Sequence, residues 1–319
     1  MAVIVYAESD SGKYKKSSFE AITYGKDLAS KIGTTCLAVT IGQPGEENLG
    51  TYGADSVVSI SGDIFSQFSA QAYAKALSAV ASSSEGNTIV ISQTYSGKSI
   101  APLVAVKQDA ALVTGIVEMV NTDEGFTVKK TSFSSKAIAH VSINHDRKVL
   151  TIIPNSYKIN SSEAETTPAN GDVSVTSEDV NTNVISINKE TGKIPLTEAE
   201  LVISAGRGLK GPENWNLVED LADALGAATA CSKPVSDMEW RPHSEHVGQT
   251  GITIKPNLYI AAGISGAIQH LAGVGSSKVI CVINTDPEAP FFKAADYGIV
   301  GDAFEVLPKL LKRVKEIKA

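Results

Sequence analysis

Apolar and polar positions alternate along the first half of the chain in a pattern typical of a parallel α/β sheet. Short apolar, β-branched runs are followed by longer stretches whose apolar residues recur at helical spacing. The predicted strands are Val3–Tyr6, Cys36–Ile41, Ser56–Ile60 and Thr88–Ser92. The predicted helices are Ser18–Ile32, capped by Ser17 or Ser18, and the alanine-rich Phe65–Ala81. Such alternation places helices on the faces of a mostly parallel sheet.

The pattern changes in the middle of the chain, where sheet-like runs give way to a polar stretch. Ala137–Ile143 and Lys148–Ile153 are apolar runs separated by His145-Asp146, which predicts a hairpin. From Asn155 to about Gly192 the chain is rich in Ser, Thr, Asn and Glu. This composition indicates a flexible loop, one strand over Asn183–Ile187, and then the connection to a second domain.

The alternation of strands and helices restarts in the second half. The predicted strands are Leu201–Ser204, Ala227–Ala230, Leu258–Ala262, Lys278–Ile283 and Tyr297–Val300. Glu213–Leu225 is a predicted helix, and a second helix is expected to open at Ser265. The C-terminal helix carries a core-facing stripe at helical spacing, formed by Phe304, Leu307, Leu310, Leu311, Val314 and Ile317.

These elements predict two α/β domains, each a mostly parallel sheet flanked by helices. The length of 319 residues also suits two domains of ~100–200 residues each. We place the N-terminal domain, which is similar in layout to a nucleotide-binding fold and is expected mainly to contact a partner, at residues 1–190. The C-terminal domain, at residues 191–319, is expected to be doubly wound.

Composition narrows the class of protein. With 43% hydrophobic and 20% charged residues the chain can build sizeable cores, and its net charge of −7 argues against nucleic acid as a partner. No apolar run approaches the ~20 residues of a membrane span, so no stable membrane insertion is expected. The three cysteines are widely spaced and form no CxxC pair, which favours a cytoplasmic protein without disulfides or zinc. No catalytic or metal-binding residues are predicted.

Glycines cluster beside the strands of the second half. They lie in Gly206-Arg207-Gly208, in Gly248-Gln249-Thr250-Gly251 and in Gly263-Ile264-Ser265-Gly266. In an open parallel sheet the loops at the carboxyl ends of strands form the ligand crevice, and glycine there lets backbone approach a phosphate. Gly263–Gly266 is therefore either a diphosphate cradle or only a tight turn. Arg207 can bind phosphate or stack on a ring, or it can form a plain surface ion pair.

The second half also contains a series of longer motifs. They are Gly206–Leu209, Val247–Gly251, Leu258–Gly273, Ile283–Phe291 and Ala295–Asp302, in order over about residues 200–314. This series resembles the FAD domain of electron-transfer flavoprotein alpha subunits. The most specific part ends in Gln269-His270-Leu271-Ala272-Gly273, and the first domain is similar in layout with softer matches.

The resemblance implies FAD as the cofactor and assigns contacts to its phosphate and adenosine parts. Arg207 would contact the diphosphate region. Ser265 and Gln269, with the helix that follows, would hold the diphosphate and the ribityl chain. Asn284 and Asp302 would face the adenosine half.

The resemblance also implies contacts to the flavin ring. Thr250, with the backbone of Gly248 and Gln249, would hydrogen-bond the isoalloxazine near N5. His270 would face the C2 carbonyl of the ring. Reduced flavin gains negative charge on this side, so hydrogen-bond donors there favour the reduced cofactor.

Two positions depart from the family pattern. Ser232-Lys233 stands where members usually have Ser-Arg, and lysine keeps the charge of arginine but cannot stack or fork. His246 stands where a glutamine is usual, and a histidine beside flavin can make the potential pH-dependent near neutrality. Ser232, Lys233 and His246 are therefore added to the predicted site. The alternative is that His243 and His246 lie on a mobile polar loop and touch nothing.

The resemblance implies an electron carrier rather than an enzyme. The flavin cleft would be completed by a beta subunit, which is expected to hold AMP or a second FAD. Electrons would come from acyl-CoA dehydrogenases or other flavoprotein dehydrogenases and pass to a membrane quinone oxidoreductase. One alternative is a bifurcating flavoprotein that takes electrons from NADH, and another is a non-redox nucleotide-binding or assembly module.

Overall fold

The computed structural model describes residues 2–123, 125–133, 137–182, 184–187 and 194–318. The chain divides into two compact units. Unit 1 comprises Met1–Thr131 and Ile138–Lys189, and unit 2 comprises Ser132–Ala137 and Glu190–Ala319. Both units are α/β, with mostly parallel sheets flanked by helices, which confirms the predicted fold class.

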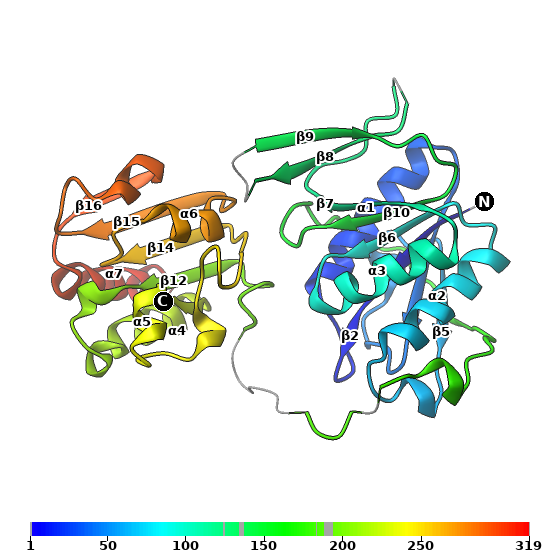
Figure 1. The fold of residues 1–319 in the computed structure, drawn as a ribbon, viewed down its shortest axis with the longest axis horizontal. Coiled ribbons are helices and arrows are strands. Elements are labelled where there is room, and N and C mark those ends of the chain that lie inside the picture. The colour runs from blue at the N-terminus through cyan, green and yellow to red at the C-terminus, as the bar shows by residue number, and fades with distance from the viewer. Residues whose placement is uncertain (1, 124, 134–136, 183, 188–193, 319) are drawn as a thin grey trace. The chain divides into compact units, whose positions relative to one another are not determined.

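The sheet of unit 1 has the order β11-β5-β4-β1-β6-β10-β7-β8-β9 over the described residues (Figure 1). The strands are β1 Ala2–Tyr6, β4 Thr35–Ile41, β5 Ser56–Ile60, β6 Thr88–Ser92, β7 Ala111–Ile116, β8 Thr127–Ser132, β9 Ala137–Ser142, β10 Lys148–Ile152 and β11 Ala169–Asn170. A separate short ribbon pairs β2 (Ser9–Asp10) with β3 (Lys13–Tyr14). The helices are α1 Lys16–Lys31, α2 Ala70–Ser83 and α3 Tyr95–Lys107. Within the sheet, β5, β4, β1 and β6 run parallel, and β8 pairs antiparallel with β7.

Apolar side chains alternate between the two faces of this sheet, because successive residues of a strand point in opposite directions. Val3 and Val5 of β1 lie in a core with α1. Ile4 and Tyr6 of the same strand lie in a second core with α2 and α3. The sheet is therefore the middle layer of three, as strand–helix alternation predicts.

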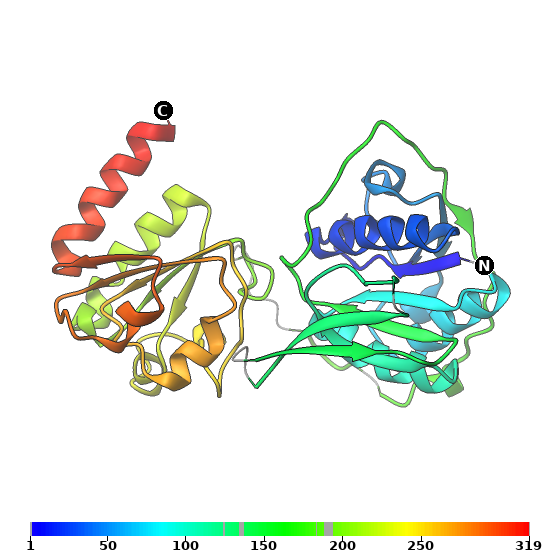
Figure 2. The ribbon, with the colours of Figure 1, turned by 90° about the horizontal axis from the view of Figure 1, so that it is seen from above.

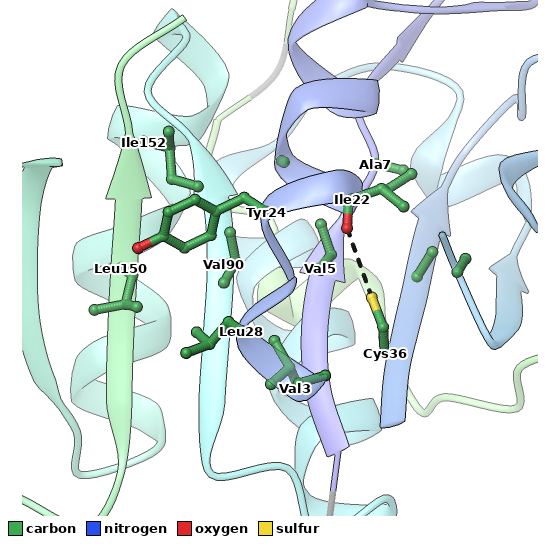
Figure 3. Packing of buried hydrophobic residues seen from close by; sticks show 14 of the residues in the cluster. Val3, Val5, Ala7, Ile22, Tyr24, Leu28, Cys36, Val90, Leu150 and Ile152 are labelled. Atoms are coloured by element: carbon green, nitrogen blue, oxygen red, sulfur yellow. Dashed lines mark hydrogen bonds between the residues drawn. The ribbon is translucent and has the colours of Figure 1, made fainter. Parts of the chain in front are cut away.

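Figure 3 shows the core beneath α1. Tyr24 and Leu28 of α1 pack there with Val90 of β6 and Leu150 of β10. Cys36 is fully buried in the same core, and burial raises the pKa of its thiol to about 12. This thiol behaves as a small apolar side chain, as expected from its isolated place in the sequence.

The expected hairpin between Ala137–Ile143 and Lys148–Ile153 is wrong. β10 lies between β6 and β7 and is parallel to both, whereas β9 neighbours β8 at the edge of the sheet. Burial gives the physical reason: β10 is buried from its second residue onward, while β9 alternates half-buried and exposed residues. A run buried on both faces suits the interior of a parallel sheet, and alternating exposure suits a half-solvated edge.

Two helices of unit 1 begin elsewhere than predicted. α1 begins at Lys16, so Ser17 and Ser18 lie inside its first turn and neither caps it. Ser18 Oγ instead donates a hydrogen bond to the carbonyl of Glu8. α2 begins at Ala70 with Ser69 as its cap, because Phe65 belongs to a separate short 3-10 turn.

The polar segment after residue 155 adds little regular structure to unit 1. Its Ala169–Asn170 pairs with β5 as β11, and Lys75 of α2 binds the carboxylate of Asp179 at 2.8 Å. The strand expected over Asn183–Ile187 is wrong for 184–187, which form no strand, and Asn183 lies outside the described residues. Alternating apolar residues alone do not make a strand where no neighbouring edge pairs with them.

The described residues of unit 2 form a parallel sheet in the order β13-β12-β14-β15-β16 (Figure 1). The strands are β12 Leu201–Ala205, β13 Ala228–Cys231, β14 Leu258–Ala262, β15 Val279–Asn284 and β16 Tyr297–Val300. The helices are α4 Asn216–Leu225, α5 Lys233–Asp237, α6 Ile268–Val274 and α7 Ala303–Lys318. α4 and α7 pack on one face and α6 packs on the other (Figure 2). The unit is doubly wound, and its strand order reverses direction between β12 and β14.

Three expectations for the helices of unit 2 are corrected. Pro212–Asn214 is a 3-10 turn, so α4 begins only at Asn216. α6 begins at Ile268 rather than at Ser265. Ile317 of the C-terminal stripe is 73% exposed, whereas Leu307 is buried against α4. Of the helices described here, none combines the length and the apolar character needed to cross a bilayer.

Candidate functional site

Two glycine turns meet where β12 and β14 end. The Gly206 N–H donates to the Ala262 carbonyl at 3.0 Å, and the Gly208 N–H donates to the Gly263 carbonyl at 3.1 Å. A Cβ on Gly208 would lie 2.6 Å from the Cα of Gly263, and a Cβ on Gly206 would lie 2.3 Å from the carbonyl oxygen of Gly263. Only glycine permits this approach of backbone to backbone. We call Gly206, Gly208 and Gly263 the glycine junction.

A cavity of about 540 Å³ opens above the glycine junction. Its walls come from the segments that follow β12, β13, β14 and β15 and from the start of α6. This is the carboxyl edge of the sheet at the point where the strand order reverses, the usual ligand position in open α/β sheets. The lining residues are Gly206, Arg207, Ser232, Lys233, Pro234, His246, Val247, Gly248, Gln249, Thr250, Gly263, Ile264, Ser265, Ala267, Gln269, His270, Asn284, Asp286 and Ala289.

Every residue predicted for the site lines this cavity except Asp302. Asp302 Oδ1 accepts a hydrogen bond from the Phe304 N–H at 3.0 Å, so its carboxylate caps the first turn of α7. Its other neighbour is Lys210, whose Nζ lies 4.0 Å from Oδ2. This local role accounts for an aspartate at position 302 without a ligand.

Two exposed cations, Arg207 and Lys233, line the cavity. Neither forms an ion pair with any residue that the structure describes, so the interpretation of Arg207 as part of a surface ion pair is not supported. Lys233 begins the short helix α5 and follows Ser232, which is buried. Both guanidinium and ammonium groups are therefore available to an anionic ligand.

The turn between β14 and α6 differs from the expected helix start. Gly266 has φ +79°, and a Cβ there would lie 2.4 Å from Cβ of Phe291, so the chain cannot be helical at this point. The Ser265 carbonyl accepts from the Phe291 N–H at 3.1 Å. Ser265 and Gly266 are thus part of a braced turn, and free N–H groups of α6 begin only after Ala267.

His246 is held in the wall of the cavity. The mobile-loop alternative for His246 is wrong, because its side chain is 2% exposed and its backbone N–H donates to the His243 carbonyl at 3.1 Å. Just before it, Arg241 makes a two-pronged ion pair with buried Glu245, at 2.8 and 2.7 Å. This pair fixes the loop that leads to His246.

The charge state of His246 follows from its surroundings. Burial is the largest cause that lowers the pKa of its imidazole, and the nearby His243 and Lys233 lower it further against an opposing effect of Asp237. The ring is therefore neutral at pH 7. Its Nδ1 is buried and has no hydrogen-bond partner among the described side chains and backbone. A buried polar atom without a partner is unusual and suits a site that receives a ligand.

His270 is also neutral, for similar reasons. It is 7% exposed, and burial with the nearby His246 lowers its pKa to about 4, although the Val247 carbonyl raises it. Its Nε2 lies 2.7 Å from the hydroxyl of Tyr259. The charge of the cavity at pH 7 therefore comes from Arg207, Lys233 and Asp286 rather than from histidine.

Asn284 has structural partners at both ends of its amide. Its Nδ2 donates to the Ile264 carbonyl at 2.9 Å, and its Oδ1 accepts from the Asp286 N–H at 3.0 Å. Asn284 thereby joins the turn after β15 to the turn after β14. Asp286, which is not among the predicted site residues, lines the cavity two residues further on. Its position in the loop after a predicted strand was the signal that could have identified it.

Two family models match the chain. The one described as electron transfer flavoprotein domain covers residues 3–181, and the one described as electron transfer flavoprotein FAD-binding domain covers residues 195–275. The chain belongs to the electron transfer flavoprotein family. Its second half thus carries the FAD-binding module of the family, as its motifs indicate.

Relatives match over nearly their whole length. The electron transfer flavoprotein subunit alpha of Syntrophomonas wolfei is 37% identical over 318 residues, which is 98% of each chain. The subunit alpha of Thermoanaerobacterium thermosaccharolyticum is 34% identical over 322 residues, again 98% of each chain. A protein of Anaerotignum propionicum named acryloyl-CoA reductase electron transfer subunit beta is 33% identical over 98% of this chain and 95% of its own. The resemblance to alpha subunits is confirmed, and membership supports a role in electron transfer.

The residues of the cavity fit the FAD of electron transfer flavoproteins. The glycine junction lets a phosphate approach the backbone, and the unpaired Arg207 and Lys233 offer charge to a diphosphate. The unpartnered Nδ1 of His246 offers a polar contact inside the wall. A volume of about 540 Å³ lies within the ~300–1,000 Å³ usual for cofactor pockets. No group of described His, Cys, Asp and Glu side chains is arranged to hold a metal ion.

Proposed function

We propose that this chain is the FAD-binding alpha subunit of a heterodimeric electron carrier. It would accept electrons from flavoprotein dehydrogenases, such as the acyl-CoA dehydrogenases of fatty acid beta-oxidation, and deliver them to a membrane quinone oxidoreductase. The observation that carries the proposal is the cavity at the carboxyl edge of the unit 2 sheet, where backbone and unpaired cations converge. The chain would act in the cytoplasm and would transform no substrate of its own.

Residues on the phosphate side of the cavity would bind and orient the cofactor. Arg207 would pair with the diphosphate, and Ser265 and Gln269 would hydrogen-bond the diphosphate and the ribityl chain. Asn284 would act toward the adenosine half mainly by bracing the turn after β14, because both ends of its amide are already engaged. Asp302 would act toward the adenosine half only indirectly, by capping the first turn of α7.

Residues on the opposite side would lie next to the flavin ring, which supplies the electron chemistry when FAD is bound. Thr250 and the backbone of Gly248 and Gln249 would offer hydrogen bonds near N5. His270 would offer a neutral imidazole near the C2 carbonyl, since its pKa is about 4. Lys233, which follows the buried Ser232, would place a positive charge near the flavin ring without the stacking that arginine gives.

The names of relatives support the proposed partners. One relative is named acryloyl-CoA reductase electron transfer subunit beta, which supports an acyl-CoA-linked redox partner for this chain. The name subunit alpha of other relatives supports a beta subunit as the partner of this chain. That partner would complete the flavin cleft and hold AMP or a second FAD.

Co-expression with the beta subunit tests the proposal. The purified heterodimer should carry FAD in the alpha subunit, and the flavin should bleach when an acyl-CoA dehydrogenase and its substrate are added. Arg207→Ala should reduce the FAD retained after gel filtration, because it removes the positive charge that would pair with the diphosphate. The fold should be unaffected, since Arg207 forms no ion pair with the described residues. A colourless heterodimer that FAD cannot reconstitute would favour the non-redox module.

The bifurcating alternative is favoured by one observation, the pair of departures at Lys233 and His246. Both line the cavity, and both alter the charge or hydrogen bonding available to a flavin. Two FAD per heterodimer together with direct oxidation of NADH would select this alternative. One FAD and no reaction with NADH would select the simple carrier.

A further inference from the structure

A buried tyrosine forms a hydrogen bond with His270, one of the two histidines that line the cavity. Tyr259 of β14 is 0% exposed, and its hydroxyl oxygen lies 2.7 Å from Nε2 of His270 on α6. The two rings also share Phe291 as a neighbour, with ring centroids 6.2 Å from Tyr259 and 5.7 Å from His270. Strand, helix and aromatic ring therefore hold this hydrogen bond in one geometry.

The direction of the hydrogen bond follows from what each group can do. Burial keeps the phenol protonated, because it raises the pKa of Tyr259 well above its usual range. The imidazole is neutral and carries one proton, so Nε2 is either the acceptor or the donor. If Nε2–H donated, the phenolic proton would need another acceptor in a fully buried place. The nearest hydroxyl, Ser204 Oγ, forms no hydrogen bond of ordinary geometry within the described structure.

The surroundings of the other ring nitrogen favour the same direction. Nδ1 of His270 is buried and has no hydrogen-bond partner among the described residues. A proton on Nδ1 therefore leaves one polar group unpaired, whereas a proton on Nε2 would leave both the phenolic O–H and Nδ1 unpaired. The titratable groups that act on the pair are His246 on the His270 side and Cys231 on the Tyr259 side. No carboxylate is among these groups, so nothing nearby draws a second proton onto the ring.

We propose that Tyr259 is a positioning residue that fixes His270 in its neutral, Nδ1-protonated form. This inference rests on the proposed function only where it concerns flavin. With FAD bound, His270 would present one defined tautomer and no charge, so the positive charge of the site would come from Arg207 and Lys233. The hydroxyl of Tyr259, which does not line the cavity, would thereby hold the imidazole of His270 in one orientation in the cavity wall.

Nitrogen NMR of the histidine rings tests this in the full chain bound to its beta subunit. Labelled histidine gives signals from the 5 rings of the chain, and His270→Gln identifies the one that belongs to His270. The wild type should show Nδ1–H at His270, unchanged from pH 8 to pH 5. Tyr259→Phe, which removes only the hydroxyl, should shift the tautomer ratio by about two- to twelvefold toward Nε2–H, the worth of one hydrogen bond.

A matched control separates this role from a loss of buried structure. Tyr24 of unit 1 is also fully buried, and its hydroxyl donates a long 3.4 Å bond to the Glu118 carbonyl. Tyr24→Phe should leave the His270 tautomer unchanged. A wild type with Nε2–H, or a Tyr259→Phe variant with the wild-type ratio, overturns the proposal. If Tyr259→Phe does not fold, the wild-type tautomer alone decides.

The two proposals can fail separately. The tautomer is read from the polypeptide, while FAD content is read from the visible spectrum of the same sample. A colourless complex with Nδ1–H at His270 would contradict the proposed function and keep the role of Tyr259. A yellow complex with Nε2–H would do the reverse.

Discussion

Removal of the Arg241 side chain should destabilise unit 2 strongly. Arg241 binds Glu245 through two parallel hydrogen bonds of 2.8 and 2.7 Å, and the side chains are 15% and 5% exposed. Its third nitrogen lies 2.9 Å from Glu219 of α4, and its guanidinium lies 5.4 Å from the Trp215 ring centroid. Arg241→Met keeps much of the apolar stem and deletes the charge, so Glu245 stays buried and loses these two hydrogen bonds and the neighbouring positive charge.

The magnitude can be estimated from burial. Breaking a buried ion pair by removing one partner costs about 3–5 kcal/mol, because the remaining charge is left without compensation. The pair with Glu219 adds only ~0–1 kcal/mol, since that carboxylate is 45% exposed. A domain is usually stable by about 5–15 kcal/mol, so Arg241→Met should remove a large part of the stability of unit 2. At roughly 1.5 kcal/mol per molar, the urea midpoint should fall by about 2–3 M.

Tryptophan fluorescence measures this unit selectively. The chain has 2 tryptophans, Trp215 and Trp240, and both lie in unit 2. Urea unfolding should be followed by midpoint and slope rather than amplitude, because Arg241 contacts the Trp215 ring. Glu219→Gln is the matched control and should shift the midpoint little.

A double variant decides whether the buried pair is the cause. Arg241→Met with Glu245→Leu removes both charges, and an apolar replacement of a buried pair is often neutral or stabilising. The double variant should therefore recover most of the midpoint lost by Arg241→Met. An Arg241→Met midpoint equal to that of the wild type, or a double variant no more stable than the single one, would refute the reasoning.

Three further changes test other parts of unit 2. Gly208→Ala should lower FAD retention several-fold in gel filtration, because its Cβ would lie 2.6 Å from the Gly263 backbone; full retention would contradict the glycine junction. His246→Gln should lessen the loss of urea stability between pH 7 and pH 5.5. The pKa of folded His246 is lowered, so the unfolded chain takes up the proton first and acid favours unfolding; an equal loss in both proteins would contradict this. Asp302→Ala should cost about 1 kcal/mol of stability, as for a lost helix cap, with FAD retention unchanged. A fall in retention would instead place Asp302 at the cofactor.

Local sequence signals predicted the elements that bear on the cavity better than the connections between them. Leu258–Ala262 and Tyr297–Val300 have the same bounds in the structure as in the sequence-based prediction, because each is a short apolar run that ends in a turn. The start of α6 was wrong because Ser265 looks like a helix cap. Gly266 at φ +79° shows that the chain must turn first, and glycine alone does not reveal which backbone conformation it adopts.

The order of strands is not contained in the local pattern. The run that forms β10 reads equally well as a hairpin arm or as a buried parallel strand, and only its neighbours β6 and β7 decide between them. The Arg241–Glu245 pair was overlooked for a related reason. Its sequence is polar and rich in charge, which suggests a mobile loop, whereas the fold buries Glu245 and turns the same charges into a fixed contact.

The charges of the cavity explain why neutral histidines matter in a proposed electron carrier. A flavin gains negative charge as it is reduced, so fixed positive charge nearby stabilises the reduced form. Arg207 and Lys233 supply such charge, but both are exposed and are screened by solvent. His246 and His270 are buried, where one added proton would act far more strongly, and burial keeps both rings uncharged. The buried rings of His246 and His270 therefore contribute polar groups without charge, and the exposed Arg207 and Lys233 contribute charge that water weakens. The potential of a bound flavin should then depend more on the orientation of the buried rings than on the number of cations.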